Sequence, residues 1–86
     1  MKSSKVLSEI RHKNQELLDD KKRPMVVKMG ESTWELLYQN DLAREFGDID
    51  TKKHSVFGIK VMFDNSLPYG VTRIYTDLKS ADVFPL

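Results

Sequence analysis

The chain has 86 residues, of which 40% are hydrophobic and 31% are charged, and its formal net charge is +1. This length and composition are typical of one small globular domain and exclude a disordered chain. The sequence contains no cysteine, which excludes disulfide bonds and thiolate chemistry. Its apolar runs are only a few residues long, so we expect no membrane span. No apolar segment follows the N-terminal lysines, and we therefore expect a cytosolic protein.

The charges are distributed unevenly along the chain. Residues 1–23 carry seven Lys and Arg residues against four acids, whereas residues 24–50 carry two against six. The first segment is therefore mildly basic and the second is acidic. Such a difference can steer a charged partner but does not determine a fold.

A first helix is predicted over residues 4–21. Its apolar residues lie on one side at helical spacing, and they are Val6, Leu7, Ile10, Leu17 and Leu18. Pro24 forces the preceding residue out of helical geometry and ends the helix. We therefore place a boundary there, between a helical arm (residues 1–23) and an α+β body (residues 24–86). The apolar stripe has to pack on this body, on a second copy or on a partner.

The body begins with a strand and a second helix. The strand is predicted over residues 25–29, and Ser32 and Glu35 form the S-x-x-E capping box that starts the helix. The apolar residues that continue along one side of this helix are Trp34, Leu37, Tyr38, Leu42 and Phe46. Asn40 and Asp41 can break or kink it, because both residue types favour caps and turns.

Two further strands follow a polar loop. Residues 48–55 lack periodicity and are predicted to form an exposed loop. Alternating apolar side chains from Phe57 to Phe63 predict a half-buried strand, and a turn containing Pro68 and Gly70 leads to a last strand over residues 71–76. The predicted fold class is α+β, a single small domain of order α-β-α-β-β whose last two strands form an antiparallel pair. The predicted core comprises Leu7, Ile10, Leu17, Val27, Trp34, Leu37, Leu42, Ile59, Val61, Phe63, Val71 and Ile74.

The residues of the sequence do not assemble into a catalytic or metal-binding set. The carboxylate pairs fall at a helix end, in a capping box and in a polar loop, where they are solvated, whereas acid–base catalysis needs one carboxylate desolvated beside another. His12 and His54 are isolated, and a zinc site needs three or four ligands at recognisable spacing. The glycines are scattered and form no phosphate-binding loop. We therefore predict that the protein is not an enzyme and uses no metal and no cofactor.

Two sets of side chains are candidates for binding. Partner-binding residues are predicted on the first helix, in the Pro68 turn and in the apolar tail, and they are Leu7, Ile10, Leu17, Tyr69 and Phe84. The alternative is a basic patch for phosphates, formed by Lys21, Lys22, Arg23, Lys52 and Lys53. These positive groups are few and acids lie close to them, so we expect weak and salt-sensitive binding of nucleic acid.

The order of features from Val26 to Thr76 resembles the peripheral-domain segment of tailed-phage major capsid proteins. In that family a long spine helix leads into a domain with strands and a shorter helix. The matching pieces are a Met-x-x-x-Thr-Trp run from Met29 to Trp34, a Gly-containing strand pattern from Val56 to Val61, and a Leu-Pro-x-Gly turn from Leu67 to Gly70. The resemblance implies a small phage-encoded protein that shares a capsid-like peripheral module.

The predicted function is non-enzymatic: a phage-derived protein that binds another protein, either in virion assembly or on the surface of a host protein. Self-association is predicted as another form of protein binding. The alternative is a small nucleic-acid-binding module that uses the basic N-terminal helix. We expect the protein in the host cytoplasm or in the virion, and we expect no membrane partner.

Overall fold

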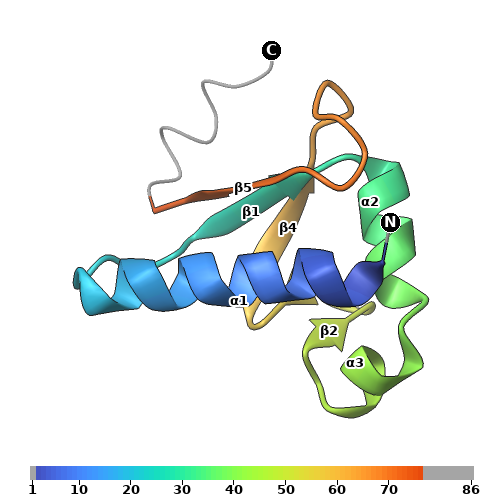
Figure 1. The fold of residues 1–86 in the computed structure, drawn as a ribbon, viewed down its shortest axis with the longest axis horizontal. Helices are drawn as coiled ribbons and strands as arrows, with labels where there is room; N and C mark the ends of the chain where they lie inside the picture. The colour runs from blue at the N-terminus through green and yellow to red at the C-terminus, as the bar shows by residue number, and fades with distance from the viewer. Residues whose placement is uncertain (1, 77–86) are drawn as a thin grey trace.

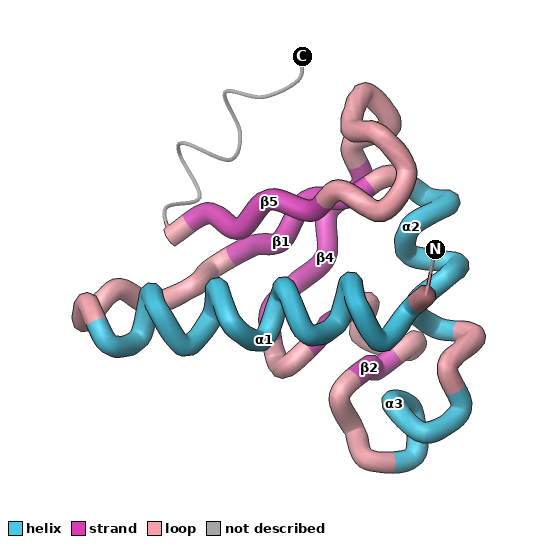
Figure 2. Tube along the Cα trace, viewed as in Figure 1, coloured by secondary structure: helices cyan, strands magenta, loops and turns pink. Residues whose placement is uncertain are grey.

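The computed structural model of the protein describes residues 2–76. Its helices are α1 (Ser3–Asp19), α2 (Glu31–Tyr38) and α3 (Asp41–Glu45), and its strands are β1 (Val26–Met29), β2 (Ile49–Asp50), β3 (Ser55–Val56), β4 (Ile59–Phe63) and β5 (Thr72–Tyr75). α1 crosses one face of the sheet, and α2 and α3 lie towards one end of it (Figure 1). Figure 2 shows the loop between β4 and β5 projecting beside α2.

The strands within residues 2–76 form one mixed sheet in the order β2-β3-β4-β1-β5. β1 pairs in parallel with β4 and antiparallel with β5. The predicted α+β class is therefore confirmed. The pairing of the last two strands differs in detail, because β4 and β5 run in opposite directions but β1 lies between them. The connection over residues 64–71 is too long for a tight hairpin and carries the chain past the end of β1.

The two faces of the sheet differ in composition. Residues that pair across neighbouring strands lie on the same face, so the strand register shows which residues belong to each face. Val27 lies beside Val61 and Ile74 on the face that packs against α1. On the opposite face Lys28 lies beside Arg73. The first face is therefore the apolar one and carries the core.

The core consists of residues from α1 and α2 packed on this apolar face. The predicted core residues that are buried are Leu7, Ile10, Val27, Trp34, Leu37, Ile59 and Val61. The prediction is wrong for Leu42, Phe63 and Val71, which are exposed, whereas Leu17 and Ile74 are partly buried. Because α1 supplies core residues, it shares one core with the rest of the described chain rather than standing apart as an arm.

The chain breaks at Asn40, as the sequence predicts. Asn40 is the N-cap of α3, where its side-chain Oδ1 accepts a hydrogen bond from the Ala43 N–H at 3.1 Å. Leu42 belongs to this separate helix and therefore does not continue the buried side of α2, which explains why Leu42 is exposed. Gly47 follows α3 with a φ of +80°, the left-handed geometry in which many helices end.

The start of α2 differs from the predicted capping box of Ser32 and Glu35. The helix begins at Glu31 with Gly30 as its N-cap, and this cap makes no side-chain hydrogen bond. Ser32 therefore lies inside the first turn and cannot act as the N-cap. Instead, Asn65 Oδ1 in the β4–β5 loop accepts a hydrogen bond from the Glu31 N–H at 2.9 Å. A residue distant in the sequence thus satisfies one of the N–H groups that every helix start leaves free.

The segments predicted as one loop and one continuous strand form two short hairpins instead. Ile49 pairs with Val56 across the β2–β3 hairpin, and the burial of both side chains explains why a polar stretch still forms strands. Phe57 and Gly58 have φ values of +50° and +78° and form the two-residue turn between β3 and β4. Phe57 is therefore a turn residue rather than part of a strand.

Asp64, which directly follows β4 and is buried, organises the start of the β4–β5 loop. Its Oδ1 accepts hydrogen bonds from both the N–H and the hydroxyl of Ser66. The Ser66 hydroxyl is the main cause of a lowered pKa for the Asp64 carboxyl, and the positive charges of Lys28 and Arg73 add to it, whereas desolvation opposes it.

We expect this carboxylate to make stability depend on pH. Because the folded-state pKa is lowered, ionised Asp64 stabilises the folded protein above its unfolded-state pKa of about 3.9. That contribution is lost as the pH falls through the folded-state pKa. Asp64→Asn should therefore be less stable than the wild type at neutral pH, with a difference that shrinks below about pH 4 in denaturant titrations. Ser66→Ala should raise the Asp64 pKa in an NMR titration, and an unchanged value would contradict the assigned cause.

Candidate functional site

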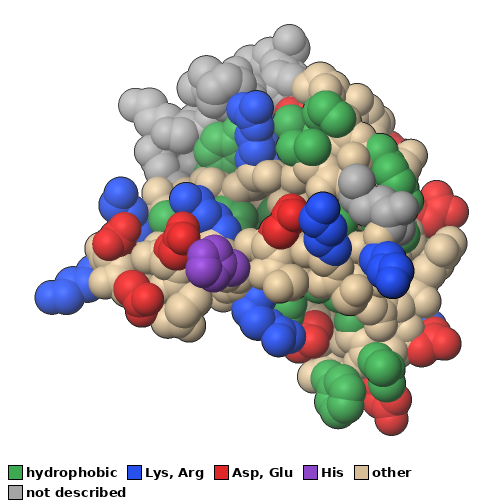
Figure 3. All heavy atoms as spheres, in the orientation of Figure 1, with side chains coloured by type: hydrophobic (Ala, Val, Ile, Leu, Met, Phe, Trp, Pro, Cys, Tyr) green, Lys and Arg blue, Asp and Glu red, His purple; other side chains and the backbone are tan. Residues whose placement is uncertain are grey.

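The most exposed large apolar side chains among residues 2–76 belong to α3 and its C-cap. Phe46 is 75% exposed and Leu42 is 63% exposed. They are four residues apart, a spacing that places them on one side of a helical turn. Figure 3 shows hydrophobic side chains standing out over α3, at the lower right of the view, with acidic side chains beside them. We call Leu42 and Phe46 the α3 patch, because exposed apolar groups that cluster are typical of contact sites.

A groove of about 230 Å³ leads from the α3 patch towards α1. The buried residues Leu7 and Ala43 contribute its apolar surface, together with the patch itself. Polar residues line the rest, and they are Ser4, Ser8, Arg11, Asn40 and Asp48. An apolar centre with a polar rim is the usual arrangement at protein–protein interfaces.

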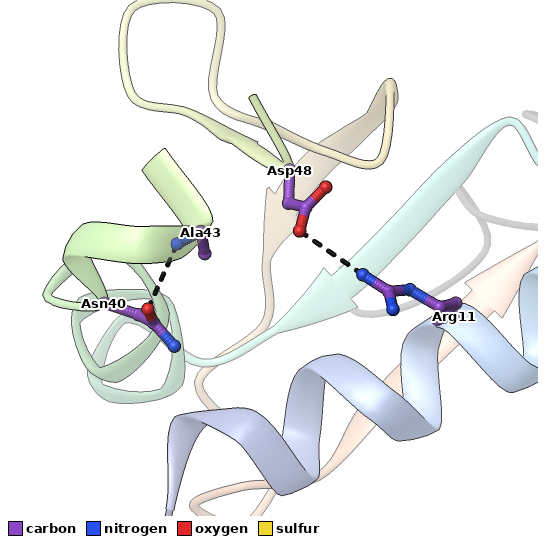
Figure 4. A network of polar contacts seen from close by, with 4 residues as sticks. All are labelled: Arg11, Asn40, Ala43 and Asp48. Carbon is purple, nitrogen blue, oxygen red and sulfur yellow. Dashed lines mark hydrogen bonds and ion pairs between the residues drawn. The ribbon is translucent and has the colours of Figure 1, made fainter. Parts of the chain in front are cut away.

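Polar contacts between α1 and the ends of α3 hold this groove together. Arg11 Nη2 on α1 lies 3.3 Å from Asp48 Oδ2, and the two side chains point towards each other (Figure 4). The Arg11 guanidinium also lies 5.0 Å from the centroid of the Phe57 ring, within the range of a cation–π contact. At the other end of α3, Asn40 Nδ2 donates a hydrogen bond to Ser3 Oγ at 3.0 Å. The contacts therefore connect α1 to both ends of α3 along the groove.

Acidic side chains predominate around the α3 patch. Asp41 and Glu45 are exposed on α3 itself, and Asp48 follows two residues after Phe46. Arg44 pairs with Asp41 and Arg11 pairs with Asp48, so these three acids keep a net charge of about −1 beside the two arginines. Residues 24–50 as a whole carry six acids against two cations. The surface that surrounds the patch therefore has a small excess of negative charge, which favours a positively charged partner.

The structure separates the predicted partner-binding residues. Leu7 and Ile10 are buried, so their side chains contact the chain's own core and form no extended exposed surface. Leu17 is partly buried on α1. Tyr69 is half-exposed in the loop beside α2, as the sequence predicts, and its role in binding remains a prediction. Phe84 lies outside the described residues.

The predicted basic patch is divided between two distant parts of the molecule. Residues 21–23 follow the end of α1, at the left of Figure 1, whereas Lys52 and Lys53 lie in the turn after β2, which is at the right. All five cations are exposed. The backbone N–H groups of Lys52 and Lys53 both donate to Asp50 Oδ1 at 3.0 Å, so a carboxylate lies beside the second group. The structure does not bring the two groups together.

The α3 patch was missed by reasoning from the sequence, which assigned Leu42 to the core and Phe46 to the same helical face. The useful signal was the break at Asn40, because a new helix changes which residues face the core. If a new helix is assumed to begin after Asn40, Leu42 and Phe46 are no longer expected on the buried side of α2.

Within residues 2–76, no three His, Asp or Glu side chains come close enough together to hold a metal ion. His12 Nε2 lies 3.0 Å from Glu16 Oε1 on the surface of α1. His54 lies between two aromatic rings, with centroids 5.7 Å from Trp34 and 6.0 Å from Phe63. Among the helices of this part of the chain, none has the length and apolar character needed to cross a membrane.

Comparison with protein-family models, with curated proteins and with solved structures finds no match to this chain. The sequence resemblance to tailed-phage capsid proteins therefore stays a prediction. A proposal for function has to start from the geometry of the α3 patch and from the charges around it.

Proposed function

We propose that this protein is a non-enzymatic protein-binding protein that inserts Leu42 and Phe46 into an apolar pocket of a partner. The observation that carries the proposal is the exposure of these two large side chains beside a groove with a polar rim. Full burial of such a side chain is worth about 1.5–3 kcal/mol. A partner that covers the patch gains this free energy, and aromatic anchors such as Phe46 are enriched at interfaces.

The charges around the patch define the chemistry of the partner. Asp41 and Asp48 already pair with Arg44 and Arg11, so the exposed Glu45 is the acid that most favours a pocket with Lys or Arg residues on its rim. Charges on the rim of an interface mainly raise the association rate, and salt screens them. We therefore expect association to slow as the salt concentration rises, while the apolar contact of the α3 patch persists.

A phage-derived origin is part of the proposal and is supported by the sequence resemblance of residues 26–76. Under this origin the partner is a virion component during assembly or a host protein whose surface the α3 patch occupies. The protein then acts in the host cytoplasm or in the virion.

Nucleic-acid binding is the second candidate function, and the exposure of the three cations over residues 21–23 favours it. Three cations at the end of α1 can neutralise only a few phosphates, so this binding should be weak and should decline with salt. Removal of nucleic acid by nuclease separates the two candidates.

Replacement of Phe46 with alanine should abolish partner capture without unfolding the protein. Because the side chain is exposed, the free energy of unfolding should change by less than about 0.5 kcal/mol. The affinity for the partner should fall by about 30-fold or more, since an interface anchor is typically worth about 2 kcal/mol. Capture from a nuclease-treated lysate identifies the partner, and titration calorimetry with the purified partner measures the loss.

Leu18→Ala is the matched control, because Leu18 is an exposed apolar residue near the other end of α1. This variant should bind as the wild type does. If Phe46→Ala and Leu42→Ala bind normally and Tyr69→Ala does not, the site is in the β4–β5 loop instead. If nuclease treatment removes every partner, the nucleic-acid candidate takes precedence.

A further inference from the structure

The outer edge of β5 is open in the described part of the chain. In the sheet order β2-β3-β4-β1-β5, β5 pairs with β1 on one side, and no strand within residues 2–76 pairs with its other side. The opposite edge of the sheet is β2, whose two residues offer little to pair with. β5 has four residues, and an open edge of this kind is a template for a further strand.

One hydrogen bond shows how the backbone groups of β5 are directed. The Tyr75 C=O accepts a hydrogen bond from the Met25 N–H at 2.8 Å, so it points towards β1, which Met25 directly precedes. Successive residues of an antiparallel strand direct their backbone groups to alternate sides. The N–H and C=O of Ile74 therefore point towards the open edge, and Ile74 is the residue about which a further antiparallel strand can pair.

A groove of about 500 Å³ lies between α1 and β5. α1 contributes Glu9, Ile10 and Lys13 to its lining, and β5 contributes Arg73 and Ile74 among others. Figure 1 shows α1 and β5 running in nearly the same direction, and the two elements are in contact. Any strand added to β5 therefore lies next to the α1 wall of this groove.

We propose that a second copy of this chain occupies the open edge, in a symmetric dimer whose β5 strands pair antiparallel about a two-fold axis at Ile74. Each Ile74 then lies opposite its counterpart on the apolar side of the sheet. On the other side, Arg73 of each copy lies opposite Tyr75 of its partner, whose ring centroid already lies 5.6 Å from Lys28 Nζ of its own chain. This interface is separate from the α3 patch, so the proposal does not depend on the proposed function.

The sequence of β5 disfavours the alternative registers. An axis at Arg73 sets two guanidinium groups directly opposite each other, and like charges in this position are destabilising. A register that pairs Arg73 of one copy with Ile74 of the other places a residue of the polar face opposite a residue of the apolar face. Directly paired residues have to lie on the same face of a sheet, so this register is disfavoured. The axis at Ile74 overlaps the whole of β5 and avoids both problems.

In the proposed dimer, the charges on α1 are complementary across the same axis. Glu9 and Lys13 are exposed one helical turn apart on the wall of the groove. A two-fold axis reverses the order of these residues in the second copy, so Glu9 of one copy faces Lys13 of the other. Lys13 Nζ lies 3.6 Å from Glu16 Oε2 in its own helix. Because exposed ion pairs contribute little free energy, Lys13 can leave Glu16 and pair with Glu9 of the second copy at little cost. This self-complementarity is the reason for assigning the edge to a second copy rather than to an unrelated peptide.

Sedimentation velocity of the full chain over a range of concentrations tests the proposal, and we expect a monomer–dimer equilibrium. Glu9→Lys and Lys13→Glu should each weaken the dimer by about fivefold or more, because each sets like charges opposite each other at two symmetric positions. The double reversal should restore the affinity to within about twofold of the wild type. Ile74→Pro should abolish the dimer, because proline removes the outward N–H while sparing the N–H groups directed at β1.

Circular dichroism and melting curves establish whether each variant is folded. If Ile74→Pro does not fold, the single and double reversals of Glu9 and Lys13 still test the proposal. Phe46→Ala and Leu18→Ala are the controls, and both should dimerise as the wild type does. The proposal is overturned if the full chain remains monomeric at about 0.5 mM, if the double reversal is no better than the single ones, or if a dimer persists in folded Ile74→Pro. A dimer that Phe46→Ala alone disrupts would place the contact at the α3 patch and also overturn it.

Discussion

Ile10→Ala should lower the free energy of unfolding by about 2–5 kcal/mol. Ile10 is 1% exposed and belongs to the core cluster that joins α1 to the sheet. Its truncation removes apolar contacts and leaves a cavity that the surrounding elements can close only in part. A domain has a total stability of about 5–15 kcal/mol, so this single change removes a large share of it. Urea denaturation followed by circular dichroism measures the loss.

Leu18→Ala is the control on the same helix, and its exposure predicts a cost below about 1 kcal/mol. Deletion of residues 1–22 should go further and prevent folding of the remainder, because it removes Val6, Leu7 and Ile10 from the core together. If the truncated chain still unfolds cooperatively at the wild-type urea concentration, α1 does not have the core role assigned to it.

Thr33→Val should destabilise the protein by about 1–3 kcal/mol. Thr33 is fully buried in α2, and its Oγ1 accepts a hydrogen bond from the Gly70 N–H at 2.9 Å. Valine keeps the shape of threonine but not the acceptor, so the Gly70 N–H is left without its partner in a buried place. The β4–β5 loop should loosen as a result, and its amide hydrogens should exchange faster. Hydrogen exchange and urea denaturation measure the two effects.

Thr33→Ser separates the hydrogen bond from the packing, because serine keeps the hydroxyl and loses only the methyl group. It should therefore retain more stability than Thr33→Val, and the β4–β5 loop should stay protected from exchange. Equal losses in the two variants would show that the methyl group, and not the hydrogen bond to Gly70, supports this contact.

Local patterns in the sequence predicted α1, α2, the break at Asn40 and the strand that contains Ile59 and Val61. Each of these depends on residues close together in the chain, such as an apolar stripe at helical spacing or a side chain that caps the next turn. The start of α2 was mispredicted, because the residue that contacts its first turn is Asn65 and comes from a distant loop. A capping box can be read from four residues, whereas a cap supplied from elsewhere requires the tertiary structure.

The order of the strands could not be predicted for the same reason. β4 and β5 follow each other in the sequence, and neighbouring strands often pair, but here β1 lies between them. The β4–β5 loop, which carries the chain past β1, contacts α2 through Asn65 and Gly70, and these contacts join residues far apart in the sequence. The candidate site shares this limitation: whether Leu42 and Phe46 are core or surface depends on the angle at which α3 leaves α2.

The central position of β1 affects how the protein is made in a cell. β1 is synthesised before β4 and β5, the two strands that pair with it, and many residues separate it from both of them. Long loops must therefore close before the middle of the sheet gains its hydrogen bonds, and such topologies fold more slowly than helical proteins of equal length. During that interval an apolar strand, Val26–Met29, has two open edges on which other nascent chains can pair. Expression at a lower temperature and a lower rate of synthesis should accordingly increase the yield of folded protein.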